Sequence, residues 1–303
     1  MRLCNWVGEA VLSLPALRRL AEAGYELHLY GKCWAPALFE GAGWPVTVRC
    51  SGLKNAISQL HGLRPRLDRG GNQVPALLMT NSFSSALEMR LAGFAPSGYA
   101  AEIRGPFLHH AYRSRVFPHA AHAYWHLSGR FLSAVEPFPA ALGWTPSAAQ
   151  QARAQELLAR HGLAPHSFVV LCPFSGADDR ENRKVWPGFQ QLAKALAAAG
   201  VAAVICPGPG EEAAALAWGT EAICVTGVDL GVYGALFQAA RCVAANDTGP
   251  GHLAAAAGAR LIGIYGPNSR PAWTPIGHAV RLFHDAPGWP GVDEVTAAVL
   301  EAS

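Results

Sequence analysis

The sequence predicts an α/β protein made of two Rossmann-like domains with a cleft between them. Strand-length apolar runs alternate with helix-length segments along the whole chain of 303 residues. The connections between them are short, which favours parallel sheets with helices on both faces. The length suits two domains of ordinary size, and a stretch rich in proline and small residues divides it.

In the first half, helices and strands are expected to alternate from the first residues onward. The first helix ends at a glycine, Gly24, and a serine begins the fourth. The expected helices cover 9–24, 35–43, 53–63, 82–94 and a longer stretch of about 108–134. The expected strands cover 25–31, 45–50 and 74–80, after a short apolar start at 1–4.

The segment 135–149 ("VEPFPAALGWTPSAA") is interpreted as the linker. It separates an N-terminal domain, 1–140, from a C-terminal domain, 150–303. The expected strands after it are 167–173, 201–208, 222–227, 242–246 and 260–266. The expected helices are 148–162, 189–200, one from 211, 230–240, 251–259 and 292–303.

Composition excludes several classes of protein. A hydrophobic fraction of 51% with only 15% charged residues is unlike a disordered chain. The longest apolar runs have the length of strands, far from the roughly 20 residues that span a bilayer. Asn5 and Glu9 interrupt the N-terminal residues, so no signal peptide is visible and a cytoplasmic location is expected.

The cysteines, the histidines and the charge distribution limit which metals and partners are expected. The seven cysteines form no CxxC pair and are expected to be buried free thiols, and the histidines match no zinc signature, so no metal is expected. Residues 1–140 carry a net charge of +6 and residues 141–303 carry −3. The basic half predicts an anionic partner, either an acidic substrate or an acidic membrane surface. Nucleic acid is not expected, because the basic residues are scattered without a recognised motif.

In parallel sheets, ligands bind at the carboxyl ends of strands, so the loops there are the candidate sites. The first carries Gly8, which permits a tight turn, and Glu9, which the helix dipole favours or which simply begins a helix. It lacks GxGxxG, which argues against a nicotinamide dehydrogenase. The long loop 173–187 offers Ser175, Gly176 and Lys184 to an anion, unless it is only a solvated charged loop.

Two later loops also carry polar groups. "CPGPGEE" places Glu211 and Glu212 where a carboxylate can bind ribose hydroxyls, although a capped helix start explains them equally well. In "NDTGPGHLAAAAGA", Asn246 or Asp247 is expected to cap a helix whose free N–H groups bind an anion. A cap alone does not explain Thr248, Gly249 and His252 together.

Short motifs in order along most of the chain resemble glycosyltransferase family 9, and among its members the ADP-heptose:lipopolysaccharide heptosyltransferases, especially heptosyltransferase II. The segment from Asn246 resembles the D-[ST]-G-x-x-H-L-A-A-A signature with a following "YGP". Trp6 to Glu9 resembles "WVGD", the segment "TNSFSSAL" at 80–87 resembles "PNSFxSAL", and Lys184 to Pro187 matches "K-x-W-P".

The resemblance implies a GT-B architecture and an inverting, metal-independent transfer from a nucleotide sugar, with no cofactor. Glu9 stands where the family has the aspartate that acts as general base, and it is longer by one methylene, about 1.5 Å. Lys184 matches the phosphate-binding lysine. The other donor-binding residues implied are Ser175, Gly176, Glu211, Glu212, Asp247, Thr248, Gly249 and His252.

The acceptor implied by the resemblance is an anionic glycolipid of the lipopolysaccharide inner core, with peripheral contact at the inner face of the inner membrane. Candidate acceptor-binding residues are Gly8, Asn81, Arg104, Arg113 and Arg115, unless the arginines are only solvated surface. Three alternatives stay open: a family 9 transferase with another sugar donor or a protein acceptor, a non-catalytic nucleotide-sugar binding protein, and a nucleotide-sugar epimerase of the same fold.

Overall fold

The chain divides into two compact units, each with its own parallel sheet. The computed structural model describes residues 1–70, 73–176, 184–267, 269–284 and 288–302. The first unit holds residues 1–39 and 43–139, and the second holds 40–42 and 140–303. All strand pairs in the described residues are parallel, so the α/β class predicted from sequence is confirmed.

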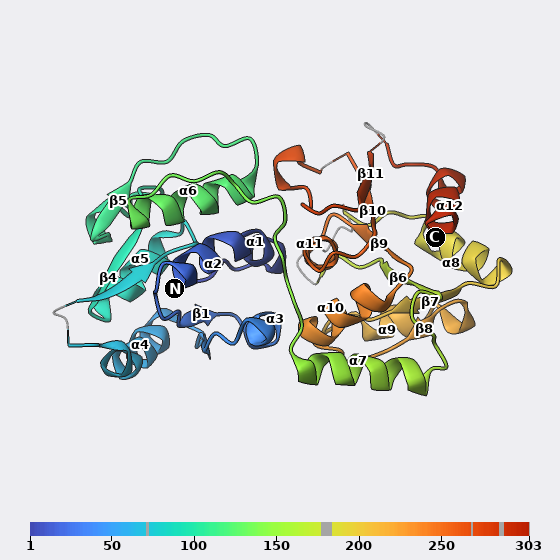
Figure 1. Ribbon diagram of the computed structural model, residues 1–303, viewed down its shortest axis with the longest axis horizontal. Coiled ribbons are helices and arrows are strands. Elements are labelled where there is room, and N and C mark those ends of the chain that lie inside the picture. The colour runs from blue at the N-terminus through green and yellow to red at the C-terminus, as the bar shows by residue number, and fades with distance from the viewer. Residues whose placement is uncertain (71–72, 177–183, 268, 285–287, 303) are drawn as a thin grey trace. The chain divides into compact units, whose positions relative to one another are not determined.

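In the first unit, the N-terminal residues join two small sheets into one (Figure 1). Arg2 forms parallel bridges to Tyr30 on one side and Leu78 on the other. The strand order is therefore β2, β1, the segment around Arg2, β3, β4 and β5. The strands are β1 (Leu29–Gly31), β2 (Val46–Val48), β3 (Val74–Leu77), β4 (Phe94–Tyr99) and β5 (His110–Tyr112).

Each predicted helical segment of the first unit contains a helix, but one segment is broken in two and another helix begins late. The helix expected over 9–24 is two helices that meet at Ser13, because Pro15 cannot supply an N–H in a helix interior and instead lies in the first turn of the second. The helices are α1 (Val7–Leu12), α2 (Leu14–Glu22), α3 (Ala35–Phe39), α4 (Leu53–Leu67), α5 (Phe83–Leu91) and α6 (Ala120–Leu132), with 3-10 turns at Gly105–Phe107 and, in the second unit, Glu40–Ala42.

The long helix expected over 108–134 is wrong in its first part. Residues His110–Tyr112 form strand β5, and α6 begins only after His119, whose ring accepts the N–H of Ala121. Strand β4 was not predicted, because Pro96 and Gly98 lower its strand propensity. It is nevertheless buried throughout and paired on both sides.

The second unit holds a six-stranded sheet in the order β8–β7–β6–β9–β10–β11. In chain order this is third, second, first, fourth, fifth, sixth, the order of a doubly wound nucleotide-binding fold. The first unit has the same order when the segment around Arg2 is counted as its first strand. The strands are β6 (Phe168–Cys172), β7 (Ala202–Ile205), β8 (Ile223–Cys224), β9 (Cys242–Asn246), β10 (Leu261–Tyr265) and β11 (Val280–His284), of which β11 was not predicted.

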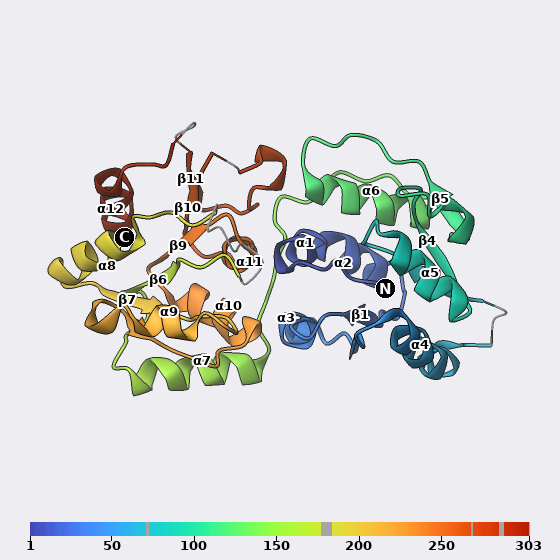
Figure 2. The same cartoon turned by 180° about the vertical axis from the view of Figure 1, so that it is seen from behind.

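Helices cover both faces of this sheet, so its central strand β6 is buried and apolar throughout. Val169 and Leu171 face a core that includes α8 and α12, whereas Cys172 contacts the Tyr233 hydroxyl of α10 on the other face. Figures 1 and 2 show α8 with α12 on one side and α7 with α10 on the other. The helices are α7 (Ala148–Arg160), α8 (Phe189–Ala198), α9 (Glu212–Leu216), α10 (Leu230–Ala239), α11 (Gly249–Ala256) and α12 (Val292–Glu301), with 3-10 turns at Gly219–Glu221 and Pro271–Trp273.

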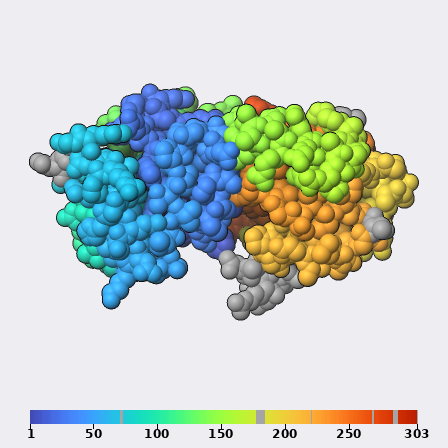
Figure 3. Space-filling model, turned by 90° about the horizontal axis from the view of Figure 1, so that it is seen from below, coloured from blue at the N-terminus to red at the C-terminus, as the bar shows by residue number. Residues whose placement is uncertain are grey.

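Helix α7 covers one surface of the second unit (Figure 3) and begins with a capping box. The Ser147 hydroxyl accepts the Gln150 N–H, and the Gln150 side chain accepts the Ser147 N–H. Glu40, which belongs to this unit, accepts hydrogen bonds from the same two side chains at 2.6 and 3.3 Å. A short earlier segment of the chain is thereby fixed to the start of α7.

The described residues also test two expectations from composition. All seven cysteines are free, and four of them are buried as expected, but Cys224 is only partly buried and Cys33 and Cys50 are exposed. Both follow strands of the first sheet, β1 and β2. None of the described helices has the length and apolar character that crossing a bilayer requires.

Candidate active site

The site in the second unit lies at the carboxyl ends of β6 and β9. These strands are neighbours, yet β7 follows β6 on one side and β10 follows β9 on the other. A doubly wound sheet binds its ligand at this point, where the two loops diverge. The loop after β6 contains Ser175 and Gly176, and the loop after β9 contains Asp247 and Thr248. The part of the first loop at 177–183, with Arg180 and Arg183, lies outside the described residues.

Asn246, the last residue of β9, joins the two loops. Its side-chain amide donates to the Pro173 carbonyl at 2.8 Å, and its Oδ1 accepts the Trp186 N–H at 3.0 Å. The side chain is buried, with 1% exposed. Asn246 therefore fixes both ends of the loop that carries Ser175 and Lys184, a role that sequence reasoning missed when it treated this residue as a helix cap.

The start of α11 differs from the prediction. The N-cap is Thr248, not Asn246 or Asp247, and the Thr248 side chain makes no capping hydrogen bond. Gly251 brings this turn close to the strand, because a Cβ there would lie 3.2 Å from the Asn246 carbonyl oxygen. The N-terminus of an eight-residue helix whose N-cap side chain leaves it uncapped thus lies at the end of β9, an arrangement that favours an anion.

Lys184 and Asp247 form an ion pair beside this helix start. Lys184 Nζ lies 3.8 Å from Asp247 Oδ2. The Lys184 side chain is 48% exposed and that of Asp247 only 11%. Burial raises the pKa of Asp247, while Lys184 and a hydrogen bond from Ser269 oppose that rise. Asp247 thus pairs with a lysine, and the N-cap of α11 is the next residue, Thr248.

His252 lies one turn into α11 and is buried, with 5% exposed. Its backbone N–H reaches the Thr248 carbonyl at 3.4 Å. The structure therefore brings Thr248, Gly249 and His252 into one helical turn at the carboxyl edge of the sheet, next to Asp247 and its lysine.

Glu211 connects the loops after β6 and β7. One carboxylate oxygen accepts the Gly176 N–H at 2.9 Å and the other accepts the Gly208 N–H at 2.8 Å. Gly176 has a φ of +85°, which suits glycine, so its N–H can point back toward the carboxylate. Glu212 instead accepts the Gly210 N–H of its own turn. Of the two candidates, Glu211 is the one built into the loop that carries Ser175.

In the first unit, Glu9 lies in the first turn of α1, the helix that follows the N-terminal strand segment, three residues after the N-cap Trp6. Glu9 is half-buried, and burial raises its pKa above the ordinary 4.5, against a smaller lowering by the backbone of Trp6. Its charge also helps to raise the pKa of the buried Cys4 thiol to about 12, after burial itself. Gly8, beside it, is buried.

Arg104 is placed differently from the expectation that it meets an acceptor. The residue is fully buried, and its guanidinium donates to the Tyr99 carbonyl at 2.8 Å, to the Thr80 carbonyl and to the Asn81 side chain at 3.2 Å. These bonds fix the loops after β3 and β4. A guanidinium without exposed surface holds the loops in place instead of offering charge to a ligand from solvent.

Three of the other acceptor candidates lie at the surface, whereas Gly8 is buried. Asn81 is exposed in the loop after β3, and Arg113 and Arg115 are exposed in the segment after β5. Arg115 lies over the Phe117 ring, 5.0 Å from its centre. These three residues follow carboxyl ends of strands in the same sheet as the segment that leads to Glu9.

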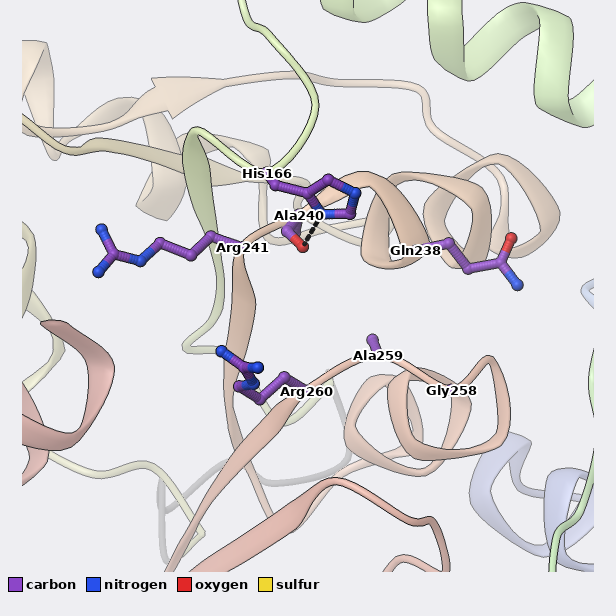
Figure 4. Close-up of a pocket in the computed structure, with 7 residues that line it drawn as sticks. All are labelled: His166, Gln238, Ala240, Arg241, Gly258, Ala259 and Arg260. Carbon is purple, nitrogen blue, oxygen red and sulfur yellow. Dashed lines mark hydrogen bonds between the residues drawn. The ribbon is translucent and has the colours of Figure 1, made fainter. Parts of the chain in front are cut away.

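A hollow of about 560 Å³ lies at the opposite edge of the second sheet (Figure 4). Arg241 and Arg260, which immediately precede β9 and β10, belong to its lining with His166. Arg241 donates to the Ala302 carbonyl at 2.8 Å and to the Leu300 carbonyl, so its guanidinium binds carbonyl groups at the C-terminal end of α12. The hollow is thus separate from the loops that carry the candidate residues.

Two doubly wound units, one with a helix N-terminus and a lysine at its switch point, are an arrangement typical of nucleotide-binding α/β proteins. The family model described as glycosyltransferase family 9 (heptosyltransferase) matches residues 71–293. The chain belongs to this family, and it is a glycosyltransferase. No curated protein matches its sequence.

Solved structures support the fold. A family 9 glycosyltransferase from Veillonella parvula has a TM-score of 0.80 at 19% identity, over 94% of this chain and 84% of that one. The E. coli ADP-heptose lipopolysaccharide heptosyltransferase II has a TM-score of 0.74 at 21% identity, over 99% and 96%. The E. coli heptosyltransferase WaaC, solved with ADP, has a TM-score of 0.76 at 19% identity, over all of both chains. The predicted GT-B fold class is confirmed by these neighbours.

Proposed function

We propose that this glycosyltransferase moves a heptose from ADP-heptose to a hydroxyl of an anionic glycolipid acceptor, the lipopolysaccharide inner core. The observation that carries the proposal is the Lys184–Asp247 pair beside the uncapped start of α11. This arrangement suits a diphosphate leaving group. E. coli WaaC, one of the similar structures, was solved with ADP and with ADP-2-deoxy-2-fluoro heptose.

The reaction is a direct displacement with inversion at the anomeric carbon. Glu9 takes the proton of the acceptor hydroxyl while its oxygen forms a bond to that carbon. The bond from the carbon to the diphosphate oxygen breaks, and ADP leaves with the bonding electrons. A raised pKa suits Glu9 to this role, because a general base works best with a pKa near the working pH.

Negative charge grows on the departing diphosphate, and the chain's own groups would stabilise it without a metal. Lys184 supplies a point charge, and the first N–H groups of α11 supply oriented dipoles. Ser175 and Gly176 would add donors from the neighbouring loop, and Glu211 would hold that loop or bind the ribose. Arg113 and Arg115, both exposed, would meet the acceptor's negative charge, with peripheral contact at an anionic membrane.

A donor panel tests the proposal. The full chain is incubated with ADP-heptose, UDP-sugars or GDP-sugars and a heptose-deficient inner-core acceptor, and the product is identified by mass spectrometry. Transfer from ADP-heptose alone is expected. Transfer from another nucleotide sugar would assign a different family 9 activity. Tight binding of ADP-heptose without turnover on any acceptor would favour a non-catalytic binding protein.

A further inference from the structure

The first unit has a hollow of its own, of about 490 Å³, on one face of its sheet. Side chains alternate between the two faces of a strand, and in β4 Phe94 joins the core with α4 and α5, whereas Ala95 and Ser97 line the hollow. Pro75 and His110 are the direct cross-strand partners of Ala95 and Ser97, and they line it as well. The floor of this first-unit hollow is therefore one face of β3, β4 and β5.

The hollow exists because α6 covers only part of this face. Tyr99, at the carboxyl end of β4, donates its hydroxyl hydrogen to the Ala123 carbonyl of α6 at 2.8 Å. Toward the amino end of the same strand, Ala95 and Ser97 are too small to fill the space below the end of the helix. A concave surface of this volume lies within the range of roughly 300–1,000 Å³ that small-molecule sites occupy.

One wall of the hollow is a chain of aromatic and cationic side chains. Strand β5 lies beside the C-terminal end of α6 (Figure 1), and Arg130 Cζ is 5.6 Å from the centre of the Tyr112 ring. The His110 ring lies 6.4 Å from that of Tyr112, and the His109 ring lies 4.4 Å from that of His110. A guanidinium and two imidazoles thus gather around one aromatic ring.

The rest of the lining offers rings and a buried hydroxyl. Tyr25 and Phe131 pack with their ring centres 5.5 Å apart. Ser97 on the floor is only 1% exposed, and its hydroxyl has no hydrogen-bond partner among the described residues. Buried polar groups are normally hydrogen-bonded, so this hydroxyl remains available to a ligand. The described residues that line the hollow include cationic groups and no carboxylate.

We infer that the first-unit hollow binds a small phosphate monoester carried on a ring. Arg130 on α6, the imidazoles on β5 and the Ser97 hydroxyl on β4 reach it from separate elements, and a phosphate has more acceptor oxygens to meet them than a carboxylate has. The aromatic rings provide a surface on which the ring of the ligand packs. Gln73 and His109 immediately precede β3 and β5, so the hollow lies toward the amino ends of the strands, away from the loops with the acceptor candidates. The inference does not rest on the proposed function.

Binding of phenyl phosphate and of glucose 6-phosphate, each measured by calorimetry with the full chain, tests the inference. We expect a dissociation constant below about 1 mM for at least one of them, and binding at least about tenfold weaker for phenol, glucose and inorganic phosphate. The tighter of the two probes shows whether the ligand's ring is aromatic or a sugar. Modification by diethyl pyrocarbonate locates the site: the bound probe should protect His109 and His110, whereas His61, exposed on α4, should react as before.

Two variants test the named contacts. Arg130→Gln should weaken binding of the probe by about tenfold, because a charge-assisted bond to phosphate is lost. Ser97→Ala should weaken it by about fivefold without lowering the midpoint of thermal unfolding, since the hydroxyl has no partner to lose among the described residues. Arg90→Gln is the matched control for Arg130→Gln, because both arginines are exposed in the last turn of a helix of the same unit. It should bind the probe as the parent does.

The outcomes decide the inference without any sugar transfer. Failure of both probes to bind at concentrations up to about 10 mM would overturn it. Binding that is equally tight in the parent, Arg130→Gln and Ser97→Ala, with His109 and His110 still reactive, would place the phosphate elsewhere and also overturn it. Inorganic phosphate that binds as tightly as both probes would exclude a ring-bearing ligand. Because no nucleotide sugar or acceptor is present, a failure of the proposed function would leave these results unaffected.

Discussion

The side-chain amide of Asn246 donates to the carbonyl oxygen of Pro173 at 2.8 Å, which joins the ends of two neighbouring strands 73 positions apart in the chain. The same side chain accepts the Trp186 N–H. One buried amide therefore determines the path of the loop that leads to Lys184. Loss of this side chain would affect both stability and the candidate donor site.

We expect Asn246→Ala to lower the free energy of unfolding by about 1–3 kcal/mol, because it leaves a buried carbonyl and a buried N–H unpaired. Chemical unfolding measures this change. ADP affinity, measured by calorimetry, should fall as well. Asn55→Ala, at an exposed position, should leave both values unchanged, and an Asn246→Ala protein of parental stability would show that the two bonds do not matter.

Lys184→Ala should weaken ADP binding by about tenfold, or about 1.4 kcal/mol. The Lys184 side chain is half exposed, so the effect on binding is moderate. The rate should fall more, by about 100-fold, because charge on the leaving group grows only during the reaction. Lys194→Ala is the control, since this lysine pairs with Glu221 on the surface of the same unit. Equal ADP affinity in both variants would remove Lys184 from the site.

Glu9→Gln should abolish transfer and leave ADP affinity unchanged, because the amide keeps the shape but cannot accept a proton. In the parent, burial raises the pKa of Glu9, so activity should be lost on acidification at a pH above the ordinary glutamate value of 4.5. The pH dependence of kcat/KM measures this limb. Glu22→Gln, at an exposed position of α2, should behave as the parent. Near-normal turnover by Glu9→Gln would exclude the role of base.

Arginines of the first unit should divide into two classes. Arg104→Gln should destabilise the protein by about 1–3 kcal/mol, because the buried carbonyls of Tyr99 and Thr80 lose their donor. Arg113→Gln and Arg115→Gln should leave the unfolding free energy unchanged and raise the acceptor KM. An acceptor KM that is unaffected when both are replaced would remove this segment from the acceptor site.

The sequence alone predicted the strands whose apolar runs are bounded by glycine, proline or polar residues. Strands β6, β9 and β10 are of this kind, and each lies within its predicted range. Strand β4 could not be predicted in the same way, because Pro96 and Gly98 are tolerated there only through pairing with strands on both sides. That pairing is a property of the assembled sheet.

For the candidate site, the rule that ligands bind at the ends of strands selected the loops to examine, and the strand order places the loops after β6 and β9 at neighbouring strands. The roles of individual side chains within these loops were harder to predict from the sequence. Whether Asn246 caps a helix or crosses to Pro173 depends on which strand is its neighbour. Whether Arg104 reaches solvent depends on the loops folded over it, which no local pattern encodes.

The contact of Glu40 with Ser147 and Gln150 has a practical consequence for dividing this protein. The second unit is discontinuous in sequence, since it includes residues 40–42, which lie between the two segments of the first unit. A gene fragment that begins at the linker would therefore encode a C-terminal half in which Ser147 and Gln150 of the α7 capping box lack their bonds to Glu40. Chimaeras that exchange donor halves between family members would have to exchange this three-residue insert together with the C-terminal half.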